Sequence, residues 1–237
     1  MFNNDISERY SRQTMLPECG EEGQRKLLES SVLLIGAGGL GSAAATYITG
    51  AGVGRIGIAD PDVVSLSNLQ RQTLYSESQI GHPKTECALK RLQGLSSIPT
   101  FTLYDKGLTA ENAREIVRDY DIVLDCTDNF PTRYLIDDAC ADEGKPWIHG
   151  AIEEFYGHLT VFNYRKGIRY SHLYPDRETL CKLPRRVMGV MGAVPGVIGA
   201  LQASEAIKII IGRDTDVLEG RLFTIDMMTM KCSLINV

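Results

Sequence analysis

The sequence contains no Cys-x-x-Cys pair, although six of its 237 residues are cysteine. The cysteines are widely spaced, at Cys19, Cys87, Cys126, Cys140, Cys181 and Cys232. Structural zinc sites usually take their thiolates from closely spaced pairs, so this spacing gives no support to a zinc site. In a chain that is not exported, isolated cysteines are typical of reduced thiols in a cytoplasmic protein.

The chain also lacks an excess of basic residues, a secretory signal and an unbroken apolar stretch. Its net charge is −5, with 25 Lys and Arg against 30 Asp and Glu, so no general positive field favours a nucleic-acid partner. Residues 1–13 hold no apolar core and no small-residue cleavage site. The apolar stretches at 32–53 and 192–211 are interrupted by glycine and polar residues, unlike membrane spans. We therefore expect a cytoplasmic protein without a membrane partner.

Short apolar runs alternate with helical patterns over residues 31–151. The hydrophobic fraction of 43% is sufficient for the core of one α/β domain. Strands are predicted at 31–36, 55–60, 101–104, 121–126 and 146–151, and helices at 39–51, 83–95, 109–120 and 130–144. Thr109 is the expected N-cap of its helix. This alternation is typical of a Rossmann-like, doubly wound α/β sheet whose N-terminal part is parallel.

The pattern changes after residue 151. We predict one domain over residues 1–237. It consists of an N-terminal helical arm at 1–30, a nucleotide-binding core at 31–151 and an antiparallel extension of the sheet at 152–237. Residues 157–164 alternate like an antiparallel strand, and 221–237 resemble a closing hairpin. Between them lie a basic, irregular crossover loop at about 165–190 and a long helix at 192–211.

A glycine-rich turn follows the first predicted strand. Gly36, Gly38, Gly39 and Gly41 would let backbone N–H groups approach a phosphate at the start of a helix. Asp60 ends the second strand, at the spacing of an acid that hydrogen-bonds ribose. The alternative is that the glycines only allow close packing of helix on strand. The combination with Asp60 favours a nucleotide but leaves the reaction open.

Two basic residues beyond the second strand favour a triphosphate over a dinucleotide. Arg71 lies in the segment Ser67–Gln72, and Lys84 begins the next predicted helix. A guanidinium and an ammonium group together can neutralise a triphosphate. An NAD-dependent oxidoreductase would use the glycines and Asp60 but leave these cations without a role. Taken singly, each would more often be a solvated surface cation.

Asp128 and Asn129 follow the fourth predicted strand, where ligands gather in open α/β sheets. A carboxylate there can hold Mg²⁺ that also binds phosphate oxygens. The alternative is that Asp128 caps the following helix, and the two roles are compatible. Asp62 and Asp125 are further candidates for the same edge.

Taken together, these motifs resemble the ThiF/MoeB/HesA family, bacterial relatives of the ubiquitin-activating enzymes. The resemblance rests on RYSRQ, GAGGLG, ADPD, SLSNLQRQTL, GHPK, DCTDN and GVIGALQASEAIKII, in this order, and covers nearly the whole chain. It implies an adenylyltransferase that uses ATP and Mg²⁺ to form an acyl-adenylate, with release of pyrophosphate. The acyl group is the C-terminal glycine of a ubiquitin-fold sulfur-carrier protein ending in Gly-Gly.

The resemblance also implies roles for individual residues. Arg12, Arg71, Lys84 and Asp128 are the expected catalytic residues, with Asp128 binding Mg²⁺ through ATP. The expected ATP contacts are Gly36, Gly38, Gly39, Gly41, Asp60, Ser67, Asn68, Gln70, Arg71, Lys84, Asp128 and Asn129. Arg12 would reach the phosphates of a partner subunit, so a homodimer is expected. The resemblance does not separate ThiS-like from MoaD-like carriers, that is, thiamin from molybdopterin biosynthesis. A ThiF-like role is preferred, and a non-catalytic nucleotide-binding scaffold is a further alternative.

The chain departs from the family pattern at two places. Many members bind zinc through two Cys-x-x-Cys pairs, but here only His172 and Cys232 lie near those positions, so no zinc is expected. Some members carry a reactive cysteine in the crossover loop, and Cys181 falls near that place. Lys182, Arg185 and Arg186 would lower the pKa of its thiol. The alternative is an ordinary loop thiol.

Overall fold

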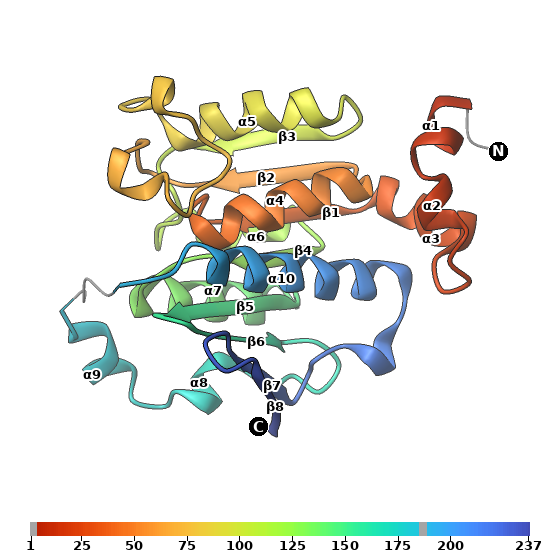
Figure 1. Ribbon diagram of the computed structural model, residues 1–237. Coiled ribbons are helices and arrows are strands. Elements are labelled where there is room, and N and C mark those ends of the chain that lie inside the picture. Colours follow the sequence, from red (N-terminus) through yellow and green to blue (C-terminus); the bar gives the residue numbers. More distant parts are fainter. Residues whose placement is uncertain (1–3, 185–188) are drawn as a thin grey trace.

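An eight-stranded sheet forms the centre of the computed structural model, which describes residues 4–184 and 189–237 (Figure 1). The strands are β1 (Ser31–Ile35), β2 (Arg55–Ala59), β3 (Thr100–Tyr104), β4 (Ile122–Asp125), β5 (Trp147–Glu153), β6 (Tyr156–Phe162), β7 (Arg221–Asp226) and β8 (Lys231–Asn236). Their spatial order is β3-β2-β1-β4-β5-β6-β7-β8. β1 to β5 pair in parallel, and β6, β7 and β8 extend the sheet in antiparallel fashion. The predicted fold class is confirmed.

The order of the strands places a ligand site at one edge of the sheet. β1 lies between β2 and β4. The chain first adds β2 and β3 on one side of β1 and later adds β4 and β5 on its other side. In register, Ile35 at the end of β1 pairs with Ala59 of β2 and with Asp125 of β4. Such a reversal point opens a crevice at the carboxyl ends of the strands. The glycine turn, the residues after β2 and the residues after β4 all begin there.

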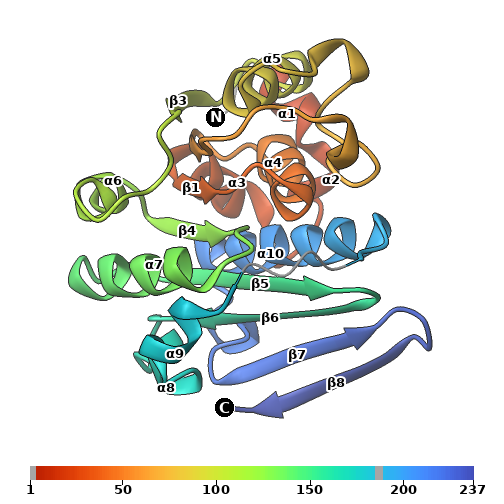
Figure 2. The same cartoon turned by 90° about the vertical axis from the view of Figure 1, so that its left-hand side faces the viewer.

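Helices cover both faces of the sheet, as Figure 2 shows. The longer ones are α3 (Gly20–Glu29), α4 (Gly39–Ala51), α5 (Lys84–Leu95), α7 (Phe130–Asp142) and α10 (Ala193–Ile211). α7 lies on one face with the short α6 (Ala113–Arg118), and α4 and α10 lie on the other.

The helix α10 is long and apolar enough to cross a membrane by length and composition alone. In this fold it packs against α4 and β5. A Cβ added at Gly199 would lie only 2.2 Å from the carbonyl oxygen of Leu40, which shows how closely the two helices approach. Gly199 therefore allows the close packing of α10 on α4 over the sheet.

The predicted N-terminal arm consists of α1 (Asn4–Arg9), α2 (Ser11–Thr14) and α3. It is anchored at the C-terminal end of α4. Gln13 and Gln24 both donate to the carbonyl oxygen of Ala51, and the buried Tyr10 packs against Gly52. The arm thus lies beside the amino ends of the parallel strands, away from their carboxyl ends (Figure 1).

Two local predictions need correction. The helix expected at 109–120 forms only over Ala113–Arg118, and Thr109 does not cap it. Instead the backbone N–H of Thr109 donates to the side chain of Asn112, which holds the preceding residues in a turn. The loop expected at 165–190 contains two short helices, α8 (Tyr170–Leu173) and α9 (Arg177–Lys182). The buried carboxylate of Asp137 accepts hydrogen bonds from the first backbone N–H groups of α8, which stabilises a segment without helical periodicity.

Candidate nucleotide-binding site

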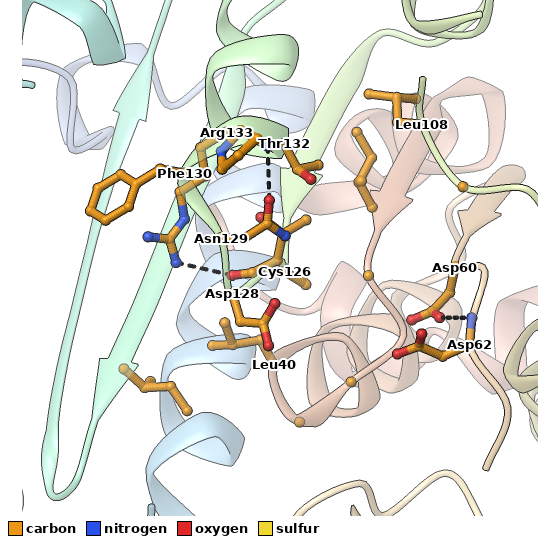
Figure 3. A pocket seen from close by; sticks show the side chains of 18 of the residues that line it. Leu40, Asp60, Asp62, Leu108, Cys126, Asp128, Asn129, Phe130, Thr132 and Arg133 are labelled. Carbon is orange, nitrogen blue, oxygen red and sulfur yellow. Dashed lines mark hydrogen bonds between the residues drawn. The ribbon is translucent and has the colours of Figure 1, made fainter. Parts of the chain in front are cut away.

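A cavity of about 940 Å³ opens at the carboxyl ends of the parallel strands. Its walls come from the turn after β1, the segments after β2 and β4, the strands β5 and β6, and α9. Figure 3 shows Asp60 and Asp62 on one side of it and Asp128 on another. The cavity therefore joins most of the predicted site residues, although these are distant from one another in the sequence.

The glycine turn ends in an uncapped helix start. Gly38 is the N-cap of α4, and no side chain among the described residues caps that helix. The first backbone N–H groups of α4 are therefore available to an anion such as a phosphate. Gly36, Gly38 and Gly39 line the cavity, whereas Gly41 does not. A Cβ at Gly41 would lie 2.1 Å from the carbonyl oxygen of Gly36, so Gly41 serves close packing of helix on strand rather than a ligand contact.

The shape of the turn depends on contacts to Ala37, the residue between the first two glycines. Its N–H donates to Oδ2 of Asp60 at 2.7 Å, and its carbonyl oxygen accepts from the hydroxyl of Tyr75 at 2.6 Å. The other oxygen of Asp60 accepts from the N–H of Asp62. Burial raises the pKa of Tyr75, and the charge of Asp60 raises it further, so the phenol stays a donor. Asp60 thus shapes the turn, and its ribose contact stays a prediction. Tyr75 carried no recognisable signal in the sequence.

Lys84 is almost completely buried, with 4% of its surface exposed. It is the first residue of α5, and its Nζ lies 2.8 Å from Oδ2 of Asp62 and 3.9 Å from Oδ2 of Asp60. The alternative of a solvated surface cation is therefore wrong for Lys84. Because an ammonium group has three donors, Lys84 can bind a phosphate while it keeps its contact with Asp62.

Arg71 is half-buried and also lines the cavity. Within residues 4–184 and 189–237, its guanidinium makes one hydrogen bond, from Nη1 to the carbonyl oxygen of Ser67 at 3.2 Å. Its Cγ would lie 3.5 Å from a Cβ placed at Gly39, so the side chain passes beside the glycine turn. This position fits a role in binding phosphate.

The segment between Ser67 and Gln72 reaches the cavity only in part. Asn68 lines it, but the exposed Ser67 and Gln70 do not, which corrects their expected position. Gln72 lines it as well and was missed in the sequence. Its Nε2 donates to the side chain of Asn68 at 3.0 Å, while its buried Oε1 has no partner among the described residues. Gln72 therefore orients Asn68.

Asn129, not Asp128, caps α7. Its Oδ1 accepts from the N–H of Thr132 at 2.9 Å. The capping alternative for Asp128 is therefore wrong, and its exposed carboxylate points into the cavity (Figure 3). A solvent-accessible carboxylate facing a phosphate-sized cavity is a suitable ligand for Mg²⁺. Of the two further candidates, Asp62 lines the cavity, whereas Asp125 is buried beneath it.

The half-buried Cys181 lines the cavity from α9. Of the cations expected to activate it, Lys182 forms an ion pair with Glu178 at 2.5 Å, and Arg185 and Arg186 lie outside the described residues.

The two candidate zinc ligands, His172 and Cys232, lie in different elements. His172 accepts a hydrogen bond from the backbone N–H of Arg169 at the start of α8, and Cys232 is exposed on β8. Over residues 4–184 and 189–237, no group of three or more His, Cys, Asp or Glu side chains forms a metal-binding cluster.

Arg12 does not line the cavity of its own chain. It is exposed on α2, next to Gln13, which contacts the C-terminal end of α4 at Ala51. Gly39, beside the cavity, begins the same helix. At 1.5 Å per residue the two ends of α4 are separated by about 20 Å. An action of Arg12 on phosphates therefore requires the cavity of another subunit.

Comparison with known proteins agrees with this geometry. The model of the ThiF family matches residues 10–237. The chain is 48% identical over 227 residues to "Adenylyltransferase and sulfurtransferase MOCS3" of Culex quinquefasciatus, covering 94% of this chain and 51% of that protein. It is 44% identical over 211 residues to "Sulfur carrier protein adenylyltransferase" of Thermus thermophilus, covering 86% of this chain and 78% of that protein.

Solved structures share the fold. E. coli MccB, crystallised with ATP, superposes with a TM-score of 0.84 at 24% identity, over 99% of this chain and 72% of that chain. The chain spans about half the length of the MOCS3 relatives it matches, so their complete set of activities is not transferred to it. The family match and the identity to the Thermus relative nevertheless cover most of the chain, and the protein therefore belongs to the ThiF family.

Proposed function

We propose that the protein activates the C-terminal glycine of a small ubiquitin-fold sulfur-carrier protein by adenylylation with Mg-ATP. The main support is one cavity that combines an uncapped helix start with two cations, Arg71 and Lys84, and a solvent-exposed carboxylate, Asp128. Two relatives have names that support the same activity. One is the "Sulfur carrier protein adenylyltransferase" of Thermus thermophilus, and the other is the "Probable molybdopterin-synthase adenylyltransferase" of Porphyra purpurea.

The chemistry requires positioning and charge neutralisation. The carrier's terminal carboxylate is ionised at neutral pH, so it needs no general base. Its oxygen forms a bond to the α-phosphorus, the bond from that phosphorus to the bridging oxygen breaks, and pyrophosphate leaves with the electron pair. Arg71 and Lys84 stabilise charge on the phosphates, and the N-terminus of α4 binds them. Bound Mg²⁺, held through Asp128, would neutralise phosphate charge.

The carrier tail requires a second part of the cavity, and the cavity extends beyond the nucleotide-facing residues. Tyr156 and His158 of β6, Leu180 and Cys181 of α9, and Val190 line this part. Burial lowers the pKa of His158 to about 3, with smaller effects from His149 and Arg133. Its imidazole is therefore neutral, which suits a tail of backbone amides ending in glycine. An extended peptide can thus approach Asp128 from the side of β6.

The activity is tested by ATP–pyrophosphate exchange with purified ThiS-like and MoaD-like carriers that end in Gly-Gly. We expect exchange that depends on Mg²⁺ and on the last glycine of the carrier, because both the attacking group and the charge neutralisation are then present. The more active carrier would indicate the thiamin or the molybdopterin pathway. A carrier that lacks its last glycine is the control.

The exchange assay and a calorimetric titration together separate the alternatives. A non-catalytic scaffold would bind Mg-ATP without exchange. An NAD-dependent oxidoreductase would bind NAD more tightly than Mg-ATP in a calorimetric titration, although the structure then leaves Arg71, Lys84 and Asp128 without a ligand. Either result would refute the proposed adenylylation.

The role of Cys181 is tested by its replacement with serine. Adenylylation needs no thiol, so Cys181→Ser should exchange pyrophosphate within about twofold of the wild-type rate. An effect on a later sulfur-transfer step, measured as sulfide incorporation into the carrier, would identify a reactive thiol. Cys232→Ser, on the exposed β8, is the matched control. A large loss of exchange in Cys181→Ser alone would show that this residue contributes to carrier or nucleotide binding instead.

A further inference from the structure

A buried polar network lies directly beneath the segment that carries Asp128. Its centre is Asp125, the last residue of β4, which is completely buried. One carboxylate oxygen of Asp125 accepts from the backbone N–H of Thr127 at 3.0 Å and from its hydroxyl at 2.6 Å. The other oxygen lies 2.7 Å from Nδ1 of His149 on β5. The carboxylate thus ties the residue before Asp128 to the neighbouring strand.

Arg133 of α7 contacts Thr127 through the next peptide group, the one that joins Thr127 to Asp128. Its Nη2 donates to the carbonyl oxygen of Thr127 at 3.0 Å, and its Nε lies 3.7 Å from Oδ2 of Asp125. The guanidinium lies near the ring of Phe130, with Cζ 5.8 Å from the ring centre (Figure 3). Only 12% of the side chain is exposed, although it lines the cavity. Thr127 is therefore bound through its N–H, its hydroxyl and its carbonyl.

The charges of this network are balanced. Burial would raise the pKa of Asp125, but the hydrogen bond from His149 and the charge of Arg133 outweigh it and hold the pKa below its ordinary value. Burial lowers the pKa of His149 despite the carboxylate beside it, so the imidazole is neutral and donates from Nδ1. The network contains one anion and one cation. A buried ion pair seldom adds stability over apolar packing, so stability alone does not explain why it lies here.

We propose that Arg133 is a positioning residue, which holds the backbone of Thr127 so that the carboxylate of Asp128 faces the phosphate-binding part of the cavity. The inference rests on the proposed function, because it assigns to Asp128 the task of binding Mg-ATP. Asp125 binds the N–H and the hydroxyl of the same residue, and His149 in turn contacts Asp125. Arg133 acts through Asp128 and needs no contact with the nucleotide.

The test is a double-mutant cycle between Arg133→Lys and Asp128→Asn. A lysine keeps the charge but cannot reproduce the planar fork that contacts Thr127 and lies beside Asp125. We expect Arg133→Lys to weaken binding of Mg-ATP about tenfold by calorimetry, and binding of ATP without Mg²⁺ by less than about twofold. In Asp128→Asn, the further change Arg133→Lys should have no added effect. The rate of ATP–pyrophosphate exchange should follow the same pattern.

Additive losses in the two variants, or an equal weakening with and without Mg²⁺, would overturn the positioning role. Arg118→Lys, an exposed arginine of α6 that pairs with Glu143, is the matched control and should behave as wild type. If Arg133→Lys does not fold, Arg133→Gln retains an amide donor for Thr127 and completes the cycle. Binding of Mg-ATP requires no carrier. Lack of exchange by the wild type would therefore count against the proposed function, while the binding cycle still decides the role of Arg133.

Discussion

Replacement of Arg71 by alanine is expected to lower the rate of ATP–pyrophosphate exchange by about 10²- to 10³-fold, the usual loss for a donor that stabilises charge in a transition state. The fold should tolerate the change. Arg71 is only half-buried, and its one hydrogen bond within the described residues goes to the carbonyl of Ser67. The free energy of unfolding, measured with urea, should therefore change by less than about 0.5 kcal/mol.

Two variants make this result specific. Arg91→Ala removes the same charge from an exposed position of α5 and should leave exchange unchanged. Arg71→Lys keeps the charge but not the two-pronged geometry, so its rate should lie between those of Arg71→Ala and the wild type. If Arg71→Ala exchanged as fast as the wild type, Arg71 would have no part in phosphate binding.

Replacement of Lys84 is a less specific test of phosphate binding than replacement of Arg71. Because its ammonium group is buried between Asp60 and Asp62, its removal leaves a buried carboxylate without a cationic partner. Breaking a buried pair in this way destabilises a protein by about 3 kcal/mol. A loss of activity in Lys84→Ala would therefore combine a folding effect with a catalytic one.

The second large effect concerns Arg12. We expect Arg12→Ala alone to lose about 10²-fold in exchange, because its positive charge would act in the cavity of a second subunit. Mixed dimers of one Arg12→Ala chain and one Arg71→Ala chain should recover about half of the wild-type rate. In such a dimer one of the two sites combines an intact Arg71 with an intact Arg12 from the partner. The dimers are isolated with two different affinity tags, and light scattering gives their mass.

The control for this complementation uses two residues that act in the same chain. Mixed dimers of Arg71→Ala and Asp128→Asn chains should remain inactive, because both side chains line one cavity and neither site is complete. No recovery with Arg12→Ala, or wild-type exchange by Arg12→Ala alone, would refute the action of Arg12 across a subunit interface. The separation of Arg12 from its own cavity along α4 would then have no functional meaning.

Local patterns predicted most of the core correctly. The strands β1, β2 and β4 and the helix α4 follow from short apolar runs and from the glycines between them. The short helices α8 and α9 were not predicted, because their stability depends on distant or capping carboxylates rather than on their own periodicity. The first turn of α8 bonds to Asp137, and Asp176 caps α9. Thr109 failed as a cap because Asn112 offered its backbone a competing turn.

By itself, the sequence determined the order of the strands along the chain, the glycine turn and the acids and cations that follow the parallel strands. These are local properties, since apolar runs, glycines and strand ends can be recognised without knowing their partners. Only the tertiary structure decided that Lys84 is buried, that Asn129 rather than Asp128 caps α7, and that Tyr75 and Arg133 support the site. Burial and hydrogen bonding of this kind depend on residues brought together from separate elements, which no single segment of the chain specifies.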